Sequence, residues 1–320
     1  MATAFEGREY SRDAEDAELI QAVSQLLEKA GVKAIRGIGP INAERTSIKI
    51  LLADDGPADL PERFETMLSN KRTFGLKLDI VRNAEPARLL LGPMPQPWQY
   101  SGPMMGGDPI WNDMARQWGT ITFAAAAGSP VEIEGKSCAN QSITCSHVLY
   151  FQGPDDVSTT LYSQSMKLGW ATDPPNGTKW IDLAGADIRA GVPFSPLEVR
   201  GLRHIKGVKQ PQTGIRVSKY GATTGLTSGR DLGWSTRDIL VGNKIYNIGV
   251  RAVSGYFARR GDSGAPVLDA DRNFLGLIVS GREGVSDDCF YLPAVPAGQP
   301  RPTPASTGIS DPSFFEIDGL

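Results

Sequence analysis

From residue 118 onward the sequence is a succession of short apolar runs separated by glycine, proline, asparagine and aspartate. The apolar runs lie at residues 119–126, 142–151, 158–168, 214–217, 244–253 and 274–280. Runs of this length, bounded by turn residues, are typical of β-strands rather than of helices. Many short strands joined by turns predict a mainly β fold, in the form of a barrel or a sandwich.

The first ninety residues have a different pattern. Their apolar residues indicate a helix at residues 11–30, strands at 32–38, 46–52 and 76–80, and a short helix at 60–68. We therefore expect a small α+β domain over residues 1–90, which packs or docks without chemistry of its own.

Two further segments are rich in proline. Residues 91–117 also concentrate glycine and methionine, and we interpret them as a linker or crossover. The segment 296–320 is expected to be an extended or disordered tail. The β-rich domain accordingly spans residues 118–295.

Charge and composition exclude several classes of function. With 36 acidic and 33 basic residues, the chain offers no electrostatic reason for a nucleic-acid or membrane partner. No apolar run approaches ~18 residues, and the polar, acidic start lacks the apolar stretch of a signal peptide. The three cysteines form no disulfide framework and predict a cytoplasmic protein. No spacing for a metal site or a phosphate loop is present, so no metal and no cofactor is expected.

The segment most informative about chemistry is Gly-Asp-Ser-Gly-Ala-Pro-Val-Leu, centred on Ser263. A serine hydroxyl is a weak nucleophile that needs a general base and N–H donors for the developing oxyanion. Gly261 and Gly264 permit a tight turn around Ser263, in which the amides of Gly261 and Ser263 are the natural oxyanion hole. An isolated Gly-Asp-Ser-Gly is more often a plain hairpin turn, but here the apolar run Phe-Leu-Gly-Leu-Ile-Val-Ser-Gly follows shortly after it, which makes the pattern more specific.

This longer segment resembles the serine motif of the chymotrypsin-like (trypsin-like) serine peptidases, bacterial ones in particular. Only the family's second glycine is replaced, by Ala265. The resemblance implies a double six-stranded antiparallel β-barrel, split near residues 190–210 and preceded by the small α+β domain. It also implies that Ser280 and Gly281 line the substrate cleft.

The chain has two histidines, so a histidine base must be His147 or His204. Residues 142–149, Ser-Ile-Thr-Cys-Ser-His-Val-Leu, resemble the family's strand that delivers its histidine. His204 stands among basic residues without such a setting and is expected on the surface. We predict His147 as the general base.

The third member of the triad is a carboxylate that orients the imidazole. Residues 179–186, Lys-Trp-Ile-Asp-Leu-Ala-Gly-Ala, resemble the family's aspartate segment and place Asp182 in this role. Asp187, five residues on, is the alternative. The order histidine, aspartate, serine is the chymotrypsin-like one.

A fourth resemblance covers residues 217–229, Val-Ser-Lys-Tyr-Gly-Ala-Thr-Thr-Gly-Leu-Thr-Ser-Gly, which match a hairpin of the family's second barrel. We predict a structural role for it. The sequence shows no activation cleavage site that would expose a new N-terminus beginning with Ile or Val. Asp262 is therefore not expected to form an ion pair with such an N-terminal amine. The enzyme would then be made active or be gated by a partner.

The resemblance places Phe257, six residues before Ser263, at the base of the primary pocket, where the family determines its substrate preference. An aspartate there would have indicated Lys/Arg preference. Arg282 either lines the cleft, favouring an acidic or polar side chain, or is a solvated surface charge.

These motifs predict a serine endopeptidase that acts on protein or peptide substrates through Ser263, His147 and Asp182. A regulatory partner is expected at the N-terminal domain. The alternative is a regulatory or binding module with a protease fold, held inactive or cleaving only itself until a partner triggers it.

Overall fold

The computed structural model describes residues 12–54, 60–89, 102–112, 117–133, 135–149, 159–161, 164–171, 182–188, 190–241, 244–281, 289–298 and 315–320. Within these residues the protein is mainly β, with one long helix and one short helix. Neither helix in the described part is long and apolar enough to span a membrane.

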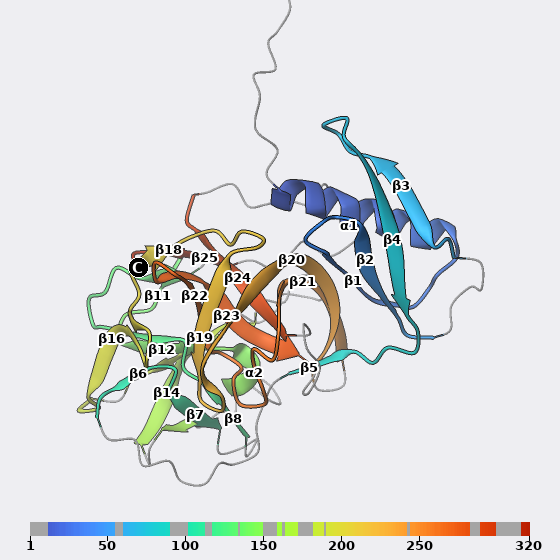
Figure 1. Ribbon diagram of the computed structural model, residues 1–320. Coiled ribbons are helices and arrows are strands. Elements are labelled where there is room, and N and C mark those ends of the chain that lie inside the picture. The colour runs from blue at the N-terminus through green and yellow to red at the C-terminus, as the bar shows by residue number, and fades with distance from the viewer. Residues whose placement is uncertain are drawn as a thin grey trace, which may run out of the picture.

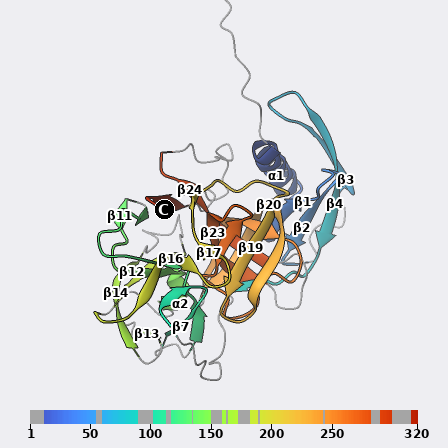
Figure 2. The same ribbon diagram turned by 60° about the vertical axis from the view of Figure 1, so that its left-hand side comes forward.

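The N-terminal unit contains α1 (Arg12–Lys29), β1 (Ile35–Ile41), β2 (Ser47–Leu52), β3 (Arg63–Met67), β4 (Thr73–Val81) and β5 (Ala87–Leu89). Apolar residues of α1 share one buried cluster with residues of β1, β2 and β4. Figures 1 and 2 show α1 lying beside these strands. Leu19, Val23 and Leu27 are fully buried in this contact. The helix is therefore held by its apolar face rather than by helix propensity alone.

The helix predicted at residues 60–68 is wrong, because this segment contains β3. Its apolar spacing fits a helix, but a turn with Lys71 at φ 65° leads directly into β4. β3 and β4 pair antiparallel from Arg63↔Lys77 to Met67↔Thr73. A partner strand thus overrides the local pattern.

The next unit contains β6 (Met104–Gly106), β7 (Pro109–Asn112), β8 (Gln117–Thr120), β9 (Phe123–Ala125), β10 (Glu132–Ile133), β11 (Lys136–Ser137), β12 (Gln141–Thr144), α2 (Ser146–Leu149), β13 (Thr159–Leu161), β14 (Gln164–Ala171) and β15 (Ala184–Asp187). Seven described strands form one sheet in the order β8-β7-β13-β14-β15-β12-β9. Within it, β12 pairs antiparallel with β15, and Thr144 lies opposite Ala184. This register brings the residues just after β12 beside those just before β15.

The remaining strands are β16 (Phe194–Val199), β17 (Arg203–His204), β18 (Gly207–Val208), β19 (Arg216–Gly221), β20 (Gly225–Val241), β21 (Lys244–Val253), β22 (Pro266–Asp269), β23 (Asn273–Gly281), β24 (Cys289–Pro296) and β25 (Phe315–Asp318). β16 and β17 form a small sheet with β6. β19 to β24 form the second β-rich unit, in which β23 lies between β22 and β24.

The N-terminal unit shares a sheet with the second β-rich unit. β20 extends to Val241 and pairs with β1 through Gly37↔Arg237 and Ile38↔Thr236. The N-terminal strands therefore continue the second sheet, as Figure 1 shows. The domain boundaries predicted from the sequence stay predictions, but this junction is a continuous sheet.

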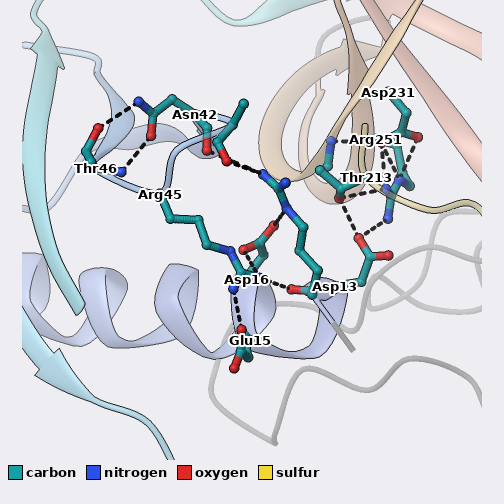
Figure 3. A network of polar contacts seen from close by, with 12 residues as sticks. Asp13, Glu15, Asp16, Asn42, Arg45, Thr46, Thr213, Asp231 and Arg251 are labelled. Atoms are coloured by element: carbon teal, nitrogen blue, oxygen red, sulfur yellow. Dashed lines mark hydrogen bonds and ion pairs between the residues drawn. The ribbon is translucent and has the colours of Figure 1, made fainter. Parts of the chain in front are cut away.

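A buried polar network reinforces the junction (Figure 3). Arg251 of β21 is 1% exposed and contacts Asp231 of β20 at 2.6 Å and Asp13 of α1 at 2.8 Å. Thr213 donates a hydrogen bond to Asp13 at 2.7 Å. Burial of an arginine is tolerated only with such partners.

The end of the chain differs from the disordered tail predicted for residues 296–320. β25 pairs parallel with β24 through Ala294↔Phe315 and antiparallel with β10 through Ile133↔Ile317. Phe315 and Ile317 are buried between these strands. Two apolar side chains at alternate positions thus hold the last residues in the sheet.

The predicted mainly β architecture behind a small α+β element is confirmed. The second sheet exceeds a six-stranded barrel, because strands of the N-terminal unit and β25 extend it in the described part of the chain.

Candidate active site

His147 and Asp182 meet where the ends of β12 and β15 lie side by side. His147 stands on α2 and its Nδ1 lies 2.5 Å from Oδ2 of Asp182. The backbone amide of His147 and the hydroxyl of Ser146 each donate to Oδ1 of Asp182 at 2.9 Å. Both side chains of the pair are buried, at 2% and 0% exposure. Asp182 therefore fixes both the position and the ring orientation of His147.

The turn that carries Ser263 precedes β22 and depends on two glycines. Gly261 and Gly264 have φ values of 96° and 90°, which L side chains rarely adopt. A Cβ atom at Gly261 would overlap the Thr223 hydroxyl, and one at Gly264 would overlap the carbonyl oxygen of Thr120. Both positions consequently require glycine.

The same turn leaves two backbone donors unused. The amide of Asp262 donates to Arg259 O at 3.0 Å and the amide of Gly264 donates to Ile278 O at 2.8 Å. Among the described residues, no hydrogen bond is donated by the amides of Gly261 and Ser263. A rigid turn with two free N–H groups can bind an oxyanion.

The first β-rich unit clamps this turn from the other side. The Thr120 amide donates to Ser263 O at 2.7 Å, and the Thr120 hydroxyl donates to Gly261 O at 2.8 Å. Thr122 donates through its hydroxyl to Gly264 O at 2.7 Å. The serine turn of one unit is thus held against the unit that carries His147 and Asp182.

In this structure the serine and the histidine are not hydrogen-bonded to each other. The Ser263 hydroxyl is buried and donates to the carbonyl oxygen of Val279 at 3.3 Å. Nε2 of His147 is buried and has no hydrogen-bond partner in the described part of the chain. The site therefore has an unused ring nitrogen and a serine hydroxyl on a single weak acceptor.

Lys219 of β19 is a residue that the sequence did not predict for the site. Its Nζ lies 3.0 Å from Oδ2 of Asp262, and both side chains are fully buried. Burial lowers the pKa of Lys219, while the charge of Asp262 opposes that effect. Asp262 also accepts hydrogen bonds from the Thr223 and Thr224 amides. The ion pair anchors the serine turn from within the chain.

A signal for Lys219 was present in the predicted hairpin. In an alternating strand, Lys219 shares a face with Val217 and Gly221, and all three are buried. A lysine on a buried face requires an acidic partner. Asp262 is the acidic residue next to the predicted nucleophile.

Cys145, His147 and Asp182 have potential metal-ligand atoms within 4.8 Å of one another. Burial raises the pKa of the Cys145 thiol well above its ordinary value, and the Asp182 charge raises it further. The thiol, with Sγ 3.2 Å from Ile278 O, is thus poorly suited to act as a thiolate ligand or nucleophile.

The other predicted residues lie as follows. Asp187 accepts a hydrogen bond from Gln141 Nε2 at 2.9 Å and is not the partner of His147. The His204 side chain is 53% exposed, with Nδ1 3.5 Å from Glu198 Oε1.

Of the predicted substrate-binding residues, Phe257 is 1% exposed and packs in an apolar cluster of the second unit. Ser280 is fully buried, and its hydroxyl has no hydrogen-bond partner within the described residues. Gly281 ends β23. Arg282 lies outside the described residues.

Comparison with known proteins gave matches among solved structures. No protein-family model matches the chain, and no curated protein sequence matches it. It is similar to Cellulomonas bogoriensis chymotrypsin, with 20% identity, 60% of this chain and 92% of that chain covered, and a TM-score of 0.44. For Thermobifida fusca protease A the corresponding values are 20%, 60%, 92% and 0.45, and for Nocardiopsis protease they are 17%, 60%, 93% and 0.45.

All three are proteases, the class that the motifs of this chain resemble. Identities of 20% or less and TM-scores below 0.5 carry no argument about activity. The function is therefore argued from the geometry of the site.

Proposed function

We propose that the protein is a serine endopeptidase that hydrolyses peptide bonds through an acyl-enzyme. The observation that carries the proposal is the buried His147–Asp182 pair, 2.5 Å apart and with Nε2 unpaired, on the unit that holds the Ser263 turn through Thr120. The two unused amides of that turn supply the oxyanion hole. These are the parts that nucleophilic catalysis by serine requires.

The chemistry follows from these groups. Rotation about χ1 frees the Ser263 hydroxyl from Val279 O, and the hydroxyl proton passes to Nε2 of His147 as Oγ adds to the scissile carbonyl carbon. The Gly261 and Ser263 amides donate to the resulting oxyanion. The C–N bond then breaks as Nε2 returns its proton to the leaving amine. Water, activated by the same nitrogen, releases the acyl group and restores Ser263.

Asp182 holds the imidazole in the tautomer that leaves Nε2 unprotonated and stabilises the imidazolium when it forms. The Lys219–Asp262 pair supports a serine turn that needs no newly cleaved N-terminus to take its shape. The substrates would be proteins or peptides, and the N-terminal unit, joined to β20, is the proposed contact for a regulatory partner.

A reducing compartment, such as the cytoplasm, fits the three cysteines. All three are free and buried. Burial raises the pKa of Cys138 to about 12, which disfavours the reactive thiolate.

A small activated ester, p-nitrophenyl acetate, tests the proposal without the need for an extended substrate. We expect a burst of nitrophenol equal to the enzyme concentration, followed by slow turnover. The burst should vanish in Ser263→Ala. The matched control Cys145→Ala removes the thiol near His147 and should keep the burst. A burst that survives Ser263→Ala would overturn the proposal.

A further inference from the structure

One edge of β23 leads directly from the nucleophile. On one side, β23 pairs with β24 from Gly276↔Pro293 to Gly281↔Cys289. On the other side it pairs first with β22, at Leu277↔Pro266. The serine turn follows on that side, with Gly264 N donating to Ile278 O and the Ser263 hydroxyl donating to Val279 O.

The next two positions along this edge are occupied by the chain's own β5. Ser280 pairs with Leu89 and Gly281 with Arg88, in antiparallel register. Because the opposite side of Ser280 and Gly281 is taken by β24, β5 lies on the same side of β23 as Ser263. It therefore continues the edge immediately beyond the nucleophile.

An extended peptide binds to a protein most simply by adding a strand to an unpaired sheet edge. The edge that ends at Ser263 is the one that such a peptide would use to bring its scissile bond to the hydroxyl. Its main-chain groups at Ser280 and Gly281 are already paired with β5. A substrate strand and β5 cannot occupy this edge together.

We propose that β5 is an autoinhibitory strand, which fills the substrate-binding edge of β23 until it is displaced. The inference rests on the proposed peptidase function and adds the regulation of its site.

β5 is built into the fold on its other side as well. It pairs parallel with β20 through Ile239↔Ala87 and Leu240↔Arg88. Ala87 is 5% exposed and belongs to the main apolar cluster. β5 is thus a strand between two strands, anchored from within the protein.

β5 connects the substrate-binding edge of β23 to the N-terminal unit. β4 ends at Val81, and the amide of Ala84 donates to Leu52 O of β2 at 2.7 Å before the chain enters β5. β20 pairs with both β5 and β1. A partner that moves the N-terminal sheet would therefore pull on the strand that covers the edge.

The test compares the double variant Arg88→Pro/Leu89→Pro with the matched control Arg88→Ala/Leu89→Ala. Proline removes the amide hydrogens of residues 88 and 89, whereas alanine keeps them. We expect cleavage of a quenched hexapeptide library to rise about tenfold or more in the proline variant alone, since the fraction of open enzyme increases. Hydrolysis of p-nitrophenyl acetate should stay within about twofold of wild type in both variants, because the small ester needs no strand.

Equal peptide cleavage in all three proteins, with intact ester hydrolysis, would overturn the inhibitory strand and leave the peptidase standing. Loss of ester hydrolysis in all three would overturn the peptidase and, with it, the inhibition.

A second measurement needs no variant. In hydrogen–deuterium exchange of the wild-type protein, the amides at residues 87–89 should be protected. They should exchange at least about tenfold faster when a tripeptidyl boronate is present at a concentration that abolishes ester hydrolysis. Unchanged protection of these amides at that concentration would overturn the proposal, because the boronate peptide and β5 would then coexist.

Discussion

Two buried polar clusters in this protein are built from similar groups and differ in how completely their hydrogen bonds are satisfied. At the N-terminal junction, Nε, Nη1 and Nη2 of Arg251 all contact acceptors on Asp231, Asp13 or Thr213. In the candidate active site, Asp182 is equally well paired, but Nε2 of His147 has no partner within the described residues. Buried polar groups are normally satisfied, so an unpaired one requires an explanation.

This is the difference expected between a cluster that joins elements and the cluster that we propose to be catalytic. Each of the three guanidinium nitrogens of Arg251 has an acceptor, and the cluster links α1 to β20 and β21 (Figure 3). The cluster around His147 leaves one ring nitrogen, Nε2, without a partner in the described part of the chain. Substitutions around Arg251 should therefore change the free energy of unfolding. Substitutions around His147 and Ser263 should change the rate of ester hydrolysis.

The largest effect is expected at Asp182. Asp182→Asn should lower kcat for p-nitrophenyl acetate by about 10⁴-fold, since an amide favours the wrong tautomer of His147. The matched control Asp187→Asn changes a carboxylate bonded to Gln141 and should stay within about threefold. A larger loss for Asp187→Asn than for Asp182→Asn would assign the orienting role to Asp187.

The next effect concerns the anchor of the serine turn. Lys219→Met leaves Asp262 buried without its cation and should cost about 3–5 kcal/mol in free energy of unfolding. Ester hydrolysis should fall as well, because Asp262 adjoins the nucleophile. Lys219→Arg keeps the charge and should retain more of both. Wild-type stability of Lys219→Met in urea unfolding would contradict the role of the pair.

The same kind of change at the junction should affect stability alone. Arg251→Met leaves two carboxylates without their cation and should cost about 3 kcal/mol in free energy of unfolding, measured in urea. At a temperature where the variant is fully folded, kcat for the small ester should be unchanged. A reduced kcat in the folded variant would erase the distinction between the two clusters.

The smallest effect is a pH dependence at α1. Burial raises the pKa of Glu15, but hydrogen bonds from Arg45 and Asn70 and the charges of Arg45 and Arg72 lower it below its ordinary value of 4.5. The ionised carboxylate thus contributes stability that is fully present above that value and lost as pH falls through the folded-state pKa.

Glu15→Gln should consequently lower the free energy of unfolding at pH 7, measured in urea. The difference from wild type should shrink as the pH is lowered below 4.5. A difference that grows in acid would show that Glu15 is not held in its ionised form.

Much of the fold was predictable because the residue patterns that indicate strands and helices are local in the sequence. Short apolar runs bounded by turn residues indicated the β-rich units, and the apolar period of residues 11–30 indicated α1. β3 was mistaken for a helix, since only pairing with β4 determines it. β25 was missed because its burial depends on β10 and β24, far away in the sequence.

The site was predictable where a residue sits in a continuous motif. The segment around Ser263 and the two-histidine count directed attention to Ser263 and His147, whose catalytic roles stay predictions. The alternating pattern of residues 217–221 puts Lys219 on a buried face but does not identify Asp262, 43 positions away, as its partner. No local pattern encodes the pairing of β5 with β23, which joins residues about 190 positions apart. Phe257 packs in an apolar cluster of the second unit, and its place at the primary pocket stays a prediction.

We propose that Ser263 is a nucleophile activated by His147. Reaction of the wild-type protein with a small fluorophosphonate, followed by peptide mapping in a mass spectrometer, tests it most directly. The account predicts one adduct, on Ser263, that forms at least about a hundredfold more slowly in His147→Ala. Absence of an adduct on Ser263, or an adduct that forms at the same rate without His147, would contradict it.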